Sequence, residues 1–161
     1  MLTDAGLIIF DPIPLLESGT FPDRKFAGRA SLVLTNGNHE RAAAEWQRGW
    51  GIPPESQTPH LFPPELAVAE WTDRDGWRAV PLPGGAPGET VFLHEGLSLG
   101  VFGDAVVNLP DRGLELLPDK YCNDPVALRT SLAGLPTFER AVFAHGQPLL
   151  SGASAKIAAL L

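Results

Sequence analysis

Two short apolar runs, each closed by polar turn residues, constrain the fold of this chain most. Gly6–Phe10 ends at Asp11-Pro12, and Ser31–Thr35 ends at Asn36-Gly37-Asn38. Apolar runs of this length, bounded by residues that favour turns, are typical of buried strands. The first part of the chain therefore predicts two buried strands, each with a polar loop at its end.

The segment after the second run has the spacing of an amphipathic helix. Its apolar side chains recur every fourth residue and form one stripe: Ala42, Trp46 and Trp50. We expect this helix to begin at residue 38 or 39, with Asn36 or Asn38 as the side-chain cap. Gly51 and Pro53 end it, because glycine frees the backbone and proline lacks an N–H.

The remainder of the chain alternates strand-like runs with turns and two further helices. Pro53–Pro64 holds five prolines, which predicts an extended loop. Four runs then predict an antiparallel meander: Leu66–Trp71, Trp77–Val80, Thr90–His94 and Leu97–Phe102. Asn108–Tyr121 reads as an irregular stretch. We expect a helix capped by Asp124, a strand over 140–144 and a last helix capped by Ser151.

This order of elements predicts one α/β domain over residues 1–161, not a helical bundle or a β-sandwich. The four tryptophans fit the predicted helix and strand periods, so we expect core packing for Trp46, Trp50, Trp71 and Trp77. Functional residues in such domains tend to lie in loops at strand ends.

Charge and cysteine content exclude several classes of function. Twelve Lys and Arg against nineteen Asp and Glu give a net charge of -7, which opposes binding to nucleic acid or to an anionic membrane. A single cysteine, Cys122, allows neither an internal disulfide nor a cysteine-based zinc site. The sequence starts without a basic leader, and its apolar runs are shorter than the ~18–20 residues that span a bilayer. We expect a cytoplasmic protein.

Four loops resemble the metal loops of the metallo-β-lactamase superfamily, in the same order and at roughly the same spacing. They are Leu34–Arg41, Leu82–Gly88, Phe102–Ala105 and Phe143–Gly146. In that family they read T-H-x-H-x-D-H, P-G-H-T-P-G, G-D and H-G, and an earlier strand ends in Asp, as Leu7–Asp11 does here. The resemblance covers nearly the whole chain. It implies an αββα sandwich of two mixed sheets, with the metal loops along one edge. The family usually has a strand hairpin before this first strand, whereas only six residues precede it here, so we expect a shortened N-terminal edge.

Most ligand positions of that family are substituted in this chain. Asn36 and Asn38 replace two histidines, Glu40 replaces the aspartate, Arg41 replaces a third histidine and Gly85 replaces a fourth. Asp104 and His145 alone match, and they would be the catalytic pair. Glycine has no ligating side chain, asparagine is a weak ligand and arginine repels cations. We therefore predict that the two-zinc centre is absent and that no cofactor is required.

Three interpretations of these loops stay open. In the first, Arg41 neutralises Asp104 or Glu40 where a metal would lie, and it binds a small anionic ligand together with Asn36 and Asn38. A plain alternative is that Arg41 is a solvated residue paired with Glu45. In the second interpretation, Glu40, Asp104 and His145 hold a single zinc or manganese ion, aided by Asn38, in a working hydrolase.

In the third interpretation the chain is a structural homodimer without an active site. Only six residues precede the first predicted strand, so the sheet edge there would be free to pair with a second copy. Asp104 would then be a turn residue, and His145 a histidine satisfied by the backbone.

Two other patterns are expected to carry no function. Gly96–Gly100 matches G-x-S-x-G, but its serine lies in a predicted strand, without the helix that a nucleophile elbow needs. Asp119 or Asp124 and then His145 would complete its triad order. His39 falls between the ligand positions and is expected to point away, and His60 and His94 form no cluster.

Overall fold

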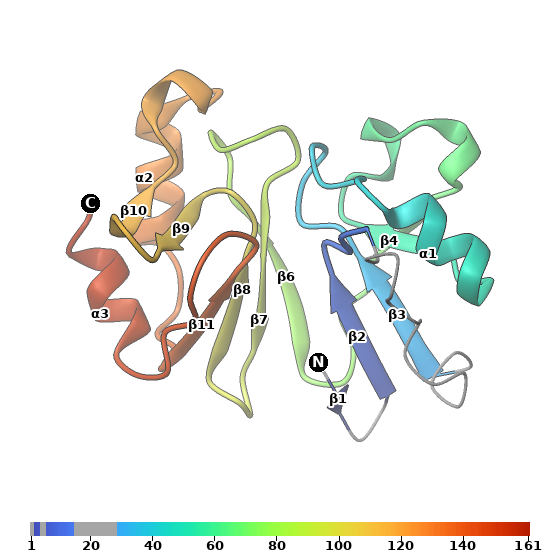
Figure 1. Cartoon of the computed structure of the whole chain (residues 1–161). Helices are drawn as coiled ribbons and strands as arrows, with labels where there is room; N and C mark the ends of the chain where they lie inside the picture. Colours follow the sequence, from blue (N-terminus) through green and yellow to red (C-terminus); the bar gives the residue numbers. More distant parts are fainter. Residues whose placement is uncertain (1, 4–5, 15–28) are drawn as a thin grey trace. The chain divides into compact units, whose positions relative to one another are not determined.

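The computed structural model describes residues 2–3, 6–14 and 29–161 (Figure 1). Compact packing divides the chain into two units, Met1–Trp71 and Thr72–Leu161. The start of the chain, where we expect no leader, includes Met1, Asp4 and Ala5. These three residues lie outside the described residues.

Among the described residues, the first unit holds a mixed five-stranded sheet with the order β1-β2-β3-β4-β5. The strands are β1 (Leu2–Thr3), β2 (Gly6–Phe10), β3 (Ala30–Val33), β4 (Pro54–Ser56) and β5 (Ala69–Glu70). β1 is antiparallel to β2, and the other neighbours are parallel. At the N-terminal edge, β1 pairs with β2 through Leu2 and Thr3.

Helix α1 (Ala43–Trp50) covers this sheet with the predicted apolar stripe. Ala42, Trp46 and Trp50 form a buried cluster with Leu32 of β3, and the two indole rings meet edge to face at 5.5 Å. Burying a large apolar side chain stabilises a fold by about 1.5–3 kcal/mol, so the two tryptophans hold α1 in place. Gly51 ends the helix in a left-handed conformation, as predicted.

Three predictions for this unit are wrong. The helix begins at Ala43, and neither Asn36 nor Asn38 caps it, because the Asn36 side chain accepts a bond from the Asn38 N–H instead. The proline-rich stretch is not only a loop. It contains β4, where Pro54 can open a strand because a first residue needs no N–H for the ladder. The run 66–71 gives only β5, which joins this sheet and not the meander.

Among the described residues, the second unit holds a four-stranded sheet with the order β11-β8-β7-β6 and a separate hairpin. The sheet strands are β6 (Trp77–Pro81), β7 (Thr90–His94), β8 (Leu99–Phe102) and β11 (Arg140–Phe143). β6, β7 and β8 form the predicted antiparallel meander, and β11 is parallel to β8. The fold class is thus confirmed: each unit combines a mixed sheet with helices.

Helices α2 (Pro125–Ala133) and α3 (Ala153–Ala158) lie on the same side of this sheet (Figure 1). Their buried residues share one core with the strands: Val91, Leu93, Phe102, Leu128, Leu132, Ala141, Ala153 and Ile157. Asp124 caps α2 as predicted, since its carboxylate accepts from the N–H groups of Val126 and Ala127. Ser151 does not cap α3, whose N-cap is Gly152.

The stretch predicted to be irregular, 108–121, contains most of a hairpin. β9 (Val106–Leu109) and β10 (Gly113–Leu116) pair antiparallel, followed by a short 3₁₀ turn at Asp119–Tyr121. The run 97–102 is shorter than expected, because Ser98 lies in the turn before β8 with a φ of 47°. A strand and not a helix follows Ser98, so the nucleophile elbow is absent, as predicted.

None of the helices in the described part of the chain has the length and apolar character needed to cross a membrane. All four tryptophans are buried, which confirms their predicted core role.

Candidate functional site

In the first unit, the ends of β2 and β3 bring Asp11, Thr35 and His39 together. The two strands are parallel and in register, Phe10 beside Val33, so the residues that follow them meet at one edge of the sheet. Asp11 is anchored there because its N–H donates to the Val33 carbonyl at 2.8 Å. Asp11 and His39 are 7% and 1% exposed. The result is a buried polar network at the end of the parallel strands.

The Asp11 carboxylate is the centre of this network. It accepts from the Thr35 N–H at 2.8 Å and from the Thr35 hydroxyl at 2.6 Å. Nδ1 of His39 lies 2.9 Å from the same carboxylate and 3.0 Å from Thr35 Oγ1. Because a carboxylate only accepts, Nδ1 of His39 is the donor, and the lone pair of the neutral ring lies on Nε2.

This arrangement corrects the expectation for His39, which is a buried, oriented side chain and not a peripheral one. A carboxylate that binds one ring nitrogen of histidine is the usual support of a metal-ligating or proton-transferring imidazole. The comparison of Leu34–Arg41 with the family motif did not identify His39, because the aligned position of that motif carries no ligand. The available signal was Asp11 at the end of the neighbouring strand, with Thr35 and His39 four residues apart.

The four predicted residues of the same loop separate into one buried and three exposed side chains. Asn36 is buried, and its side-chain oxygen accepts from the Asn38 N–H at 2.9 Å. Asn38, Glu40 and Arg41 are exposed. Arg41 has a positive φ of 26°, which is unusual for a residue with a side chain. The Asn36 side chain therefore closes the turn. This hydrogen bond uses one acceptor position of the Asn36 side-chain oxygen.

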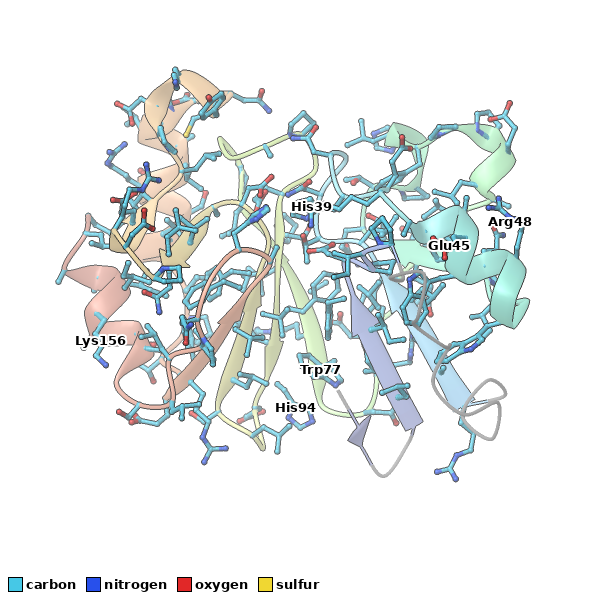
Figure 2. All side chains as sticks on the ribbon, viewed as in Figure 1. His39, Glu45, Arg48, Trp77, His94 and Lys156 are labelled. Carbon is cyan, nitrogen blue, oxygen red and sulfur yellow. The ribbon has the colours of Figure 1, made fainter. Side chains whose placement is uncertain are left out.

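Arg41 and Glu40 line a pocket of about 430 Å³ between the helix α1 and the turn at Pro64–Leu66. Its lining residues are Glu40, Arg41, Ala44, Gln47, Arg48, Pro63, Glu65 and Leu66. Ala44 and Arg48 share one side of α1 because they are four residues apart, and Arg41 lies in the turn before the helix. Figure 2 shows Arg48 on α1, together with Glu45. The pocket thus joins two arginine side chains to two acidic ones.

Two of the pairings considered for Arg41 are absent. Neither Glu45 nor Glu40 makes an ion pair with any residue in the described ranges, so Arg41 is not paired with either of them. Arg48 and Glu65 likewise form no ion pair within the described part of the chain.

In the second unit, the ends of β8 and β11 bring Asp104 and His145 together. These strands are parallel, with Phe102 beside Phe143, so the loops after them emerge at the same edge of the sheet. The Ala144 N–H donates to the Phe102 carbonyl at 2.9 Å and keeps the two strand ends together. Nε2 of His145 lies 3.3 Å from Oδ1 of Asp104. The predicted catalytic pair is therefore in contact.

The Asp104–His145 pair is more accessible than the Asp11–His39 pair. The His145 side chain is 43% exposed and that of Asp104 is 17% exposed. A carboxylate and an imidazole in contact are ligand types that a divalent ion accepts, and they are also an ordinary acid–base pair.

The loop that includes Gly85 is packed against a buried carboxylate, Glu89, that motif reading did not find. Glu89 is buried, and its side chain accepts from the Ala105 N–H at 2.9 Å. A Cβ atom added at Gly85 would lie 2.8 Å from Cγ of Glu89, closer than real side chains approach. The Glu89 side chain therefore occupies space beside Gly85 that any other residue at this position would need.

Cys122 is a free, partly buried cysteine. Burial, the largest cause, and the nearby Asp119 carboxylate raise the pKa of the Cys122 thiol above its ordinary value. Its sulfur also lies 3.5 Å from the Leu117 carbonyl as a donor. A thiol of raised pKa reacts slowly at neutral pH.

No family model matches the sequence, and a comparison with curated proteins gave no match. Solved structures do match. A metallo-β-lactamase from Erythrobacter litoralis, with β-mercaptoethanol in its active site, has a TM-score of 0.63 and 13% identity, over 99% of this chain and 81% of that one. The B3 metallo-β-lactamase BLEG-1 has a TM-score of 0.63 and 15% identity, over 92% and 85%.

The protein TTHA1623, in a di-iron-bound form, has a TM-score of 0.54 and 21% identity, over 81% of this chain and 77% of that one. At these identities the likeness establishes the fold. The chain has the metallo-β-lactamase fold, and the resemblance seen in its loops is confirmed at that level.

Proposed function

We propose that this chain is a hydrolase-like protein of the metallo-β-lactamase fold that lacks the two-zinc centre and binds a small anionic molecule beside Arg41. The observation that carries the ligand part is the pocket that Arg41 and Arg48 line. The metal part follows from the donor groups that the loops offer.

The donor set does not fit two zinc ions. A catalytic zinc typically takes three protein ligands, and a pair of ions needs roughly twice as many. At the family's ligand positions, Gly85 offers no donor and faces the packed Glu89 side chain. The Asn36 oxygen already accepts a turn hydrogen bond, and Arg41 is a cation. Without zinc to lower its pKa, water is a poor nucleophile at neutral pH.

The Arg41 pocket supports an anionic ligand because one of its guanidinium groups has no acidic partner among the residues that the structure describes. Arg48 forms no ion pair in the described part of the chain, and guanidinium groups bind carboxylate or phosphate oxygens in pairs. Glu40 and Glu65 line the same pocket. They favour a ligand that carries hydroxyl or amino donors beside its anionic group.

Calorimetric titration with inorganic phosphate and with malate, a hydroxy-dicarboxylate, tests this proposal. Loss of a charged hydrogen bond costs about 1.5–3 kcal/mol, so we expect Arg48→Gln to weaken malate binding about 10–100-fold. Arg112→Gln is the matched control, since Arg112 lies in a surface ion pair with Glu115 at 3.0 Å. If the wild type, Arg48→Gln and Arg112→Gln bind malate equally, or if neither malate nor phosphate binds, the proposal of an anionic ligand in this pocket is wrong.

A second candidate is a hydrolase that uses one zinc or manganese ion on Glu40, Asp104 and His145. The contact between Asp104 and His145 favours it, because ligands of one ion must lie close together. Added manganese or zinc would then raise the melting temperature, and Asp104→Asn would abolish that increase while Asp73→Asn would not. If neither metal changes the melting temperature, the result argues against this candidate.

We further propose that the protein works in the cytoplasm as a homodimer, without nucleic acid or membrane partners. Support for a dimer through the first sheet comes from the position of β1 at the end of the strand order, because an edge strand presents backbone groups that a second copy can pair with. Sedimentation over a wide concentration range tests it, and a constant monomer mass contradicts it. In that case the structural-homodimer interpretation also fails.

A further inference from the structure

A second pocket lies at the edge of the four-stranded sheet that is remote from Asp104 and His145. Those two residues follow the ends of β8 and β11, whereas β7 ends and β8 and β11 begin at the other edge. The pocket there measures about 480 Å³. It belongs wholly to the second unit, and its lining is Gly76, Arg78, Leu93, His94, Glu95, Ser98, Leu99, Pro136, Thr137 and Phe138.

The apolar part of this pocket is rigid. Leu93 and Phe138 are buried members of the core that the helices α2 and α3 cover. The Phe138 ring packs at 5.7 Å from the Phe102 ring, and Leu99 is buried at the start of β8. A ligand would meet a preformed apolar surface here, as small-molecule sites usually offer.

Ser98 fixes the wall between the turn and β11. Its hydroxyl oxygen accepts from the Glu139 N–H at 2.9 Å, and its carbonyl accepts from the N–H groups of Glu139 and Arg140 at 3.0 and 2.9 Å. These bonds hold Ser98 at its positive φ of 47°. A residue kept in this sparsely populated region by its surroundings is often found at a functional site, and a fixed wall lowers the ordering cost of binding.

His94 is fixed as well. Its Nδ1 accepts from the Leu97 N–H at 3.2 Å, and its ring meets the buried Trp77 ring edge to face at 5.0 Å. Figure 2 shows the two side chains next to each other. Because Nδ1 accepts, the neutral ring carries its hydrogen on Nε2, so His94 is a donor there.

The pocket also holds two opposite charges that do not neutralise each other. Arg78 and Glu95 are exposed, and neither makes an ion pair, with the other or with any residue in the described ranges. A guanidinium pairs best with a carboxylate, and a carboxylate pairs well with an ammonium group. The chemistry complementary to this lining is a small zwitterion with an apolar substituent.

We propose that this pocket binds an α-amino acid with an apolar side chain. The ligand carboxylate pairs with Arg78, its ammonium group pairs with Glu95, and its side chain lies on Leu93 and Phe138. The hydroxyl groups of Ser98 and Thr137 are further hydrogen-bonding partners. This proposal is independent of the Arg41 pocket, which lies in the first unit.

Titrations of the full chain with leucine, leucinamide and N-acetylleucine test it, with binding followed by calorimetry or by amide NMR shifts. Leucinamide lacks the carboxylate and N-acetylleucine lacks the ammonium group. We expect leucine to bind, and each derivative to bind at least about tenfold more weakly because each loses one charged hydrogen bond.

Two variants assign the contacts. In Arg78→Gln the preference for leucine over leucinamide should disappear, and in Glu95→Gln the preference over N-acetylleucine should disappear. Arg112→Gln and Glu115→Gln, which alter a surface pair, should keep both preferences. The proposal is overturned if leucine shows no saturable binding up to ~10 mM, a concentration that would detect even weak binding. It is also overturned if leucinamide binds the wild-type protein as well as leucine does.

Discussion

The two units place a carboxylate and a histidine together by the same means but in different surroundings. In the first unit, Asp11 and His39 follow parallel strands and are buried with Thr35. In the second, Asp104 and His145 also follow parallel strands, but at 3.3 Å and with a half-exposed imidazole. Burial makes the first pair stabilise the fold as well as orient the His39 imidazole, whereas the second pair is more accessible.

The largest expected effect distinguishes these two pairs. Asp11→Ala removes the buried acceptor shared by the Thr35 N–H, the Thr35 hydroxyl and His39 Nδ1. Loss of each such hydrogen bond costs about 1–3 kcal/mol, so we expect a loss of about 3–5 kcal/mol in the free energy of unfolding. Urea denaturation measures it.

Asp104→Ala is the matched control for this experiment. Its partner His145 is half-exposed, and such pairs contribute about 0–1 kcal/mol. If Asp104→Ala destabilises the protein as much as Asp11→Ala, the contrast between a buried and an accessible pair is wrong.

A smaller effect on stability is expected from replacing Gly85 with the histidine that the family has at this position. In Gly85→His the new side chain must displace Glu89, whose Cγ would lie 2.8 Å from the added Cβ. Overpacking of this kind costs about 1–3 kcal/mol. Thermal unfolding with and without zinc is the measurement. A variant that becomes more stable than the parent only when zinc is present would show that the loop can accept a ligand after all.

The smallest effect compares the starts of α1 and α2. Asp124→Ala should lower stability by about 0.5–2 kcal/mol because it removes the acceptor for two N–H groups at the start of α2. Asn38→Ala should change stability by less than ~0.5 kcal/mol, since its side chain does not cap α1. Equal losses in chemical denaturation would mean that the loop before α1 is a cap after all.

The sequence predicted elements well where the apolar pattern is strong, either as a helical stripe or as a continuously buried run. The stripe with Trp46 and Trp50 and the buried strand Thr90–His94 are examples. It failed at the hairpin β9–β10, where most residues are half-buried on both sides and hydrophobic contrast is weak. It also failed at β4, because proline at a strand's first position looks like a loop signal.

The candidate site shows the same limit. Asp104 and His145 were found because their motifs survive, and parallel pairing of β8 and β11 then brings them together. His39 and Glu89 were missed because tertiary contacts define them: the Asp11 carboxylate orients one, and the Ala105 N–H holds the other. No local pattern carries those contacts.

Elemental analysis of the protein, purified without chelators and in the presence of zinc, measures whether each chain holds a two-zinc centre. We predict fewer than two zinc ions per chain, with none retained or a single weakly held ion. Two tightly bound zinc ions per chain, resistant to dialysis, would contradict this prediction.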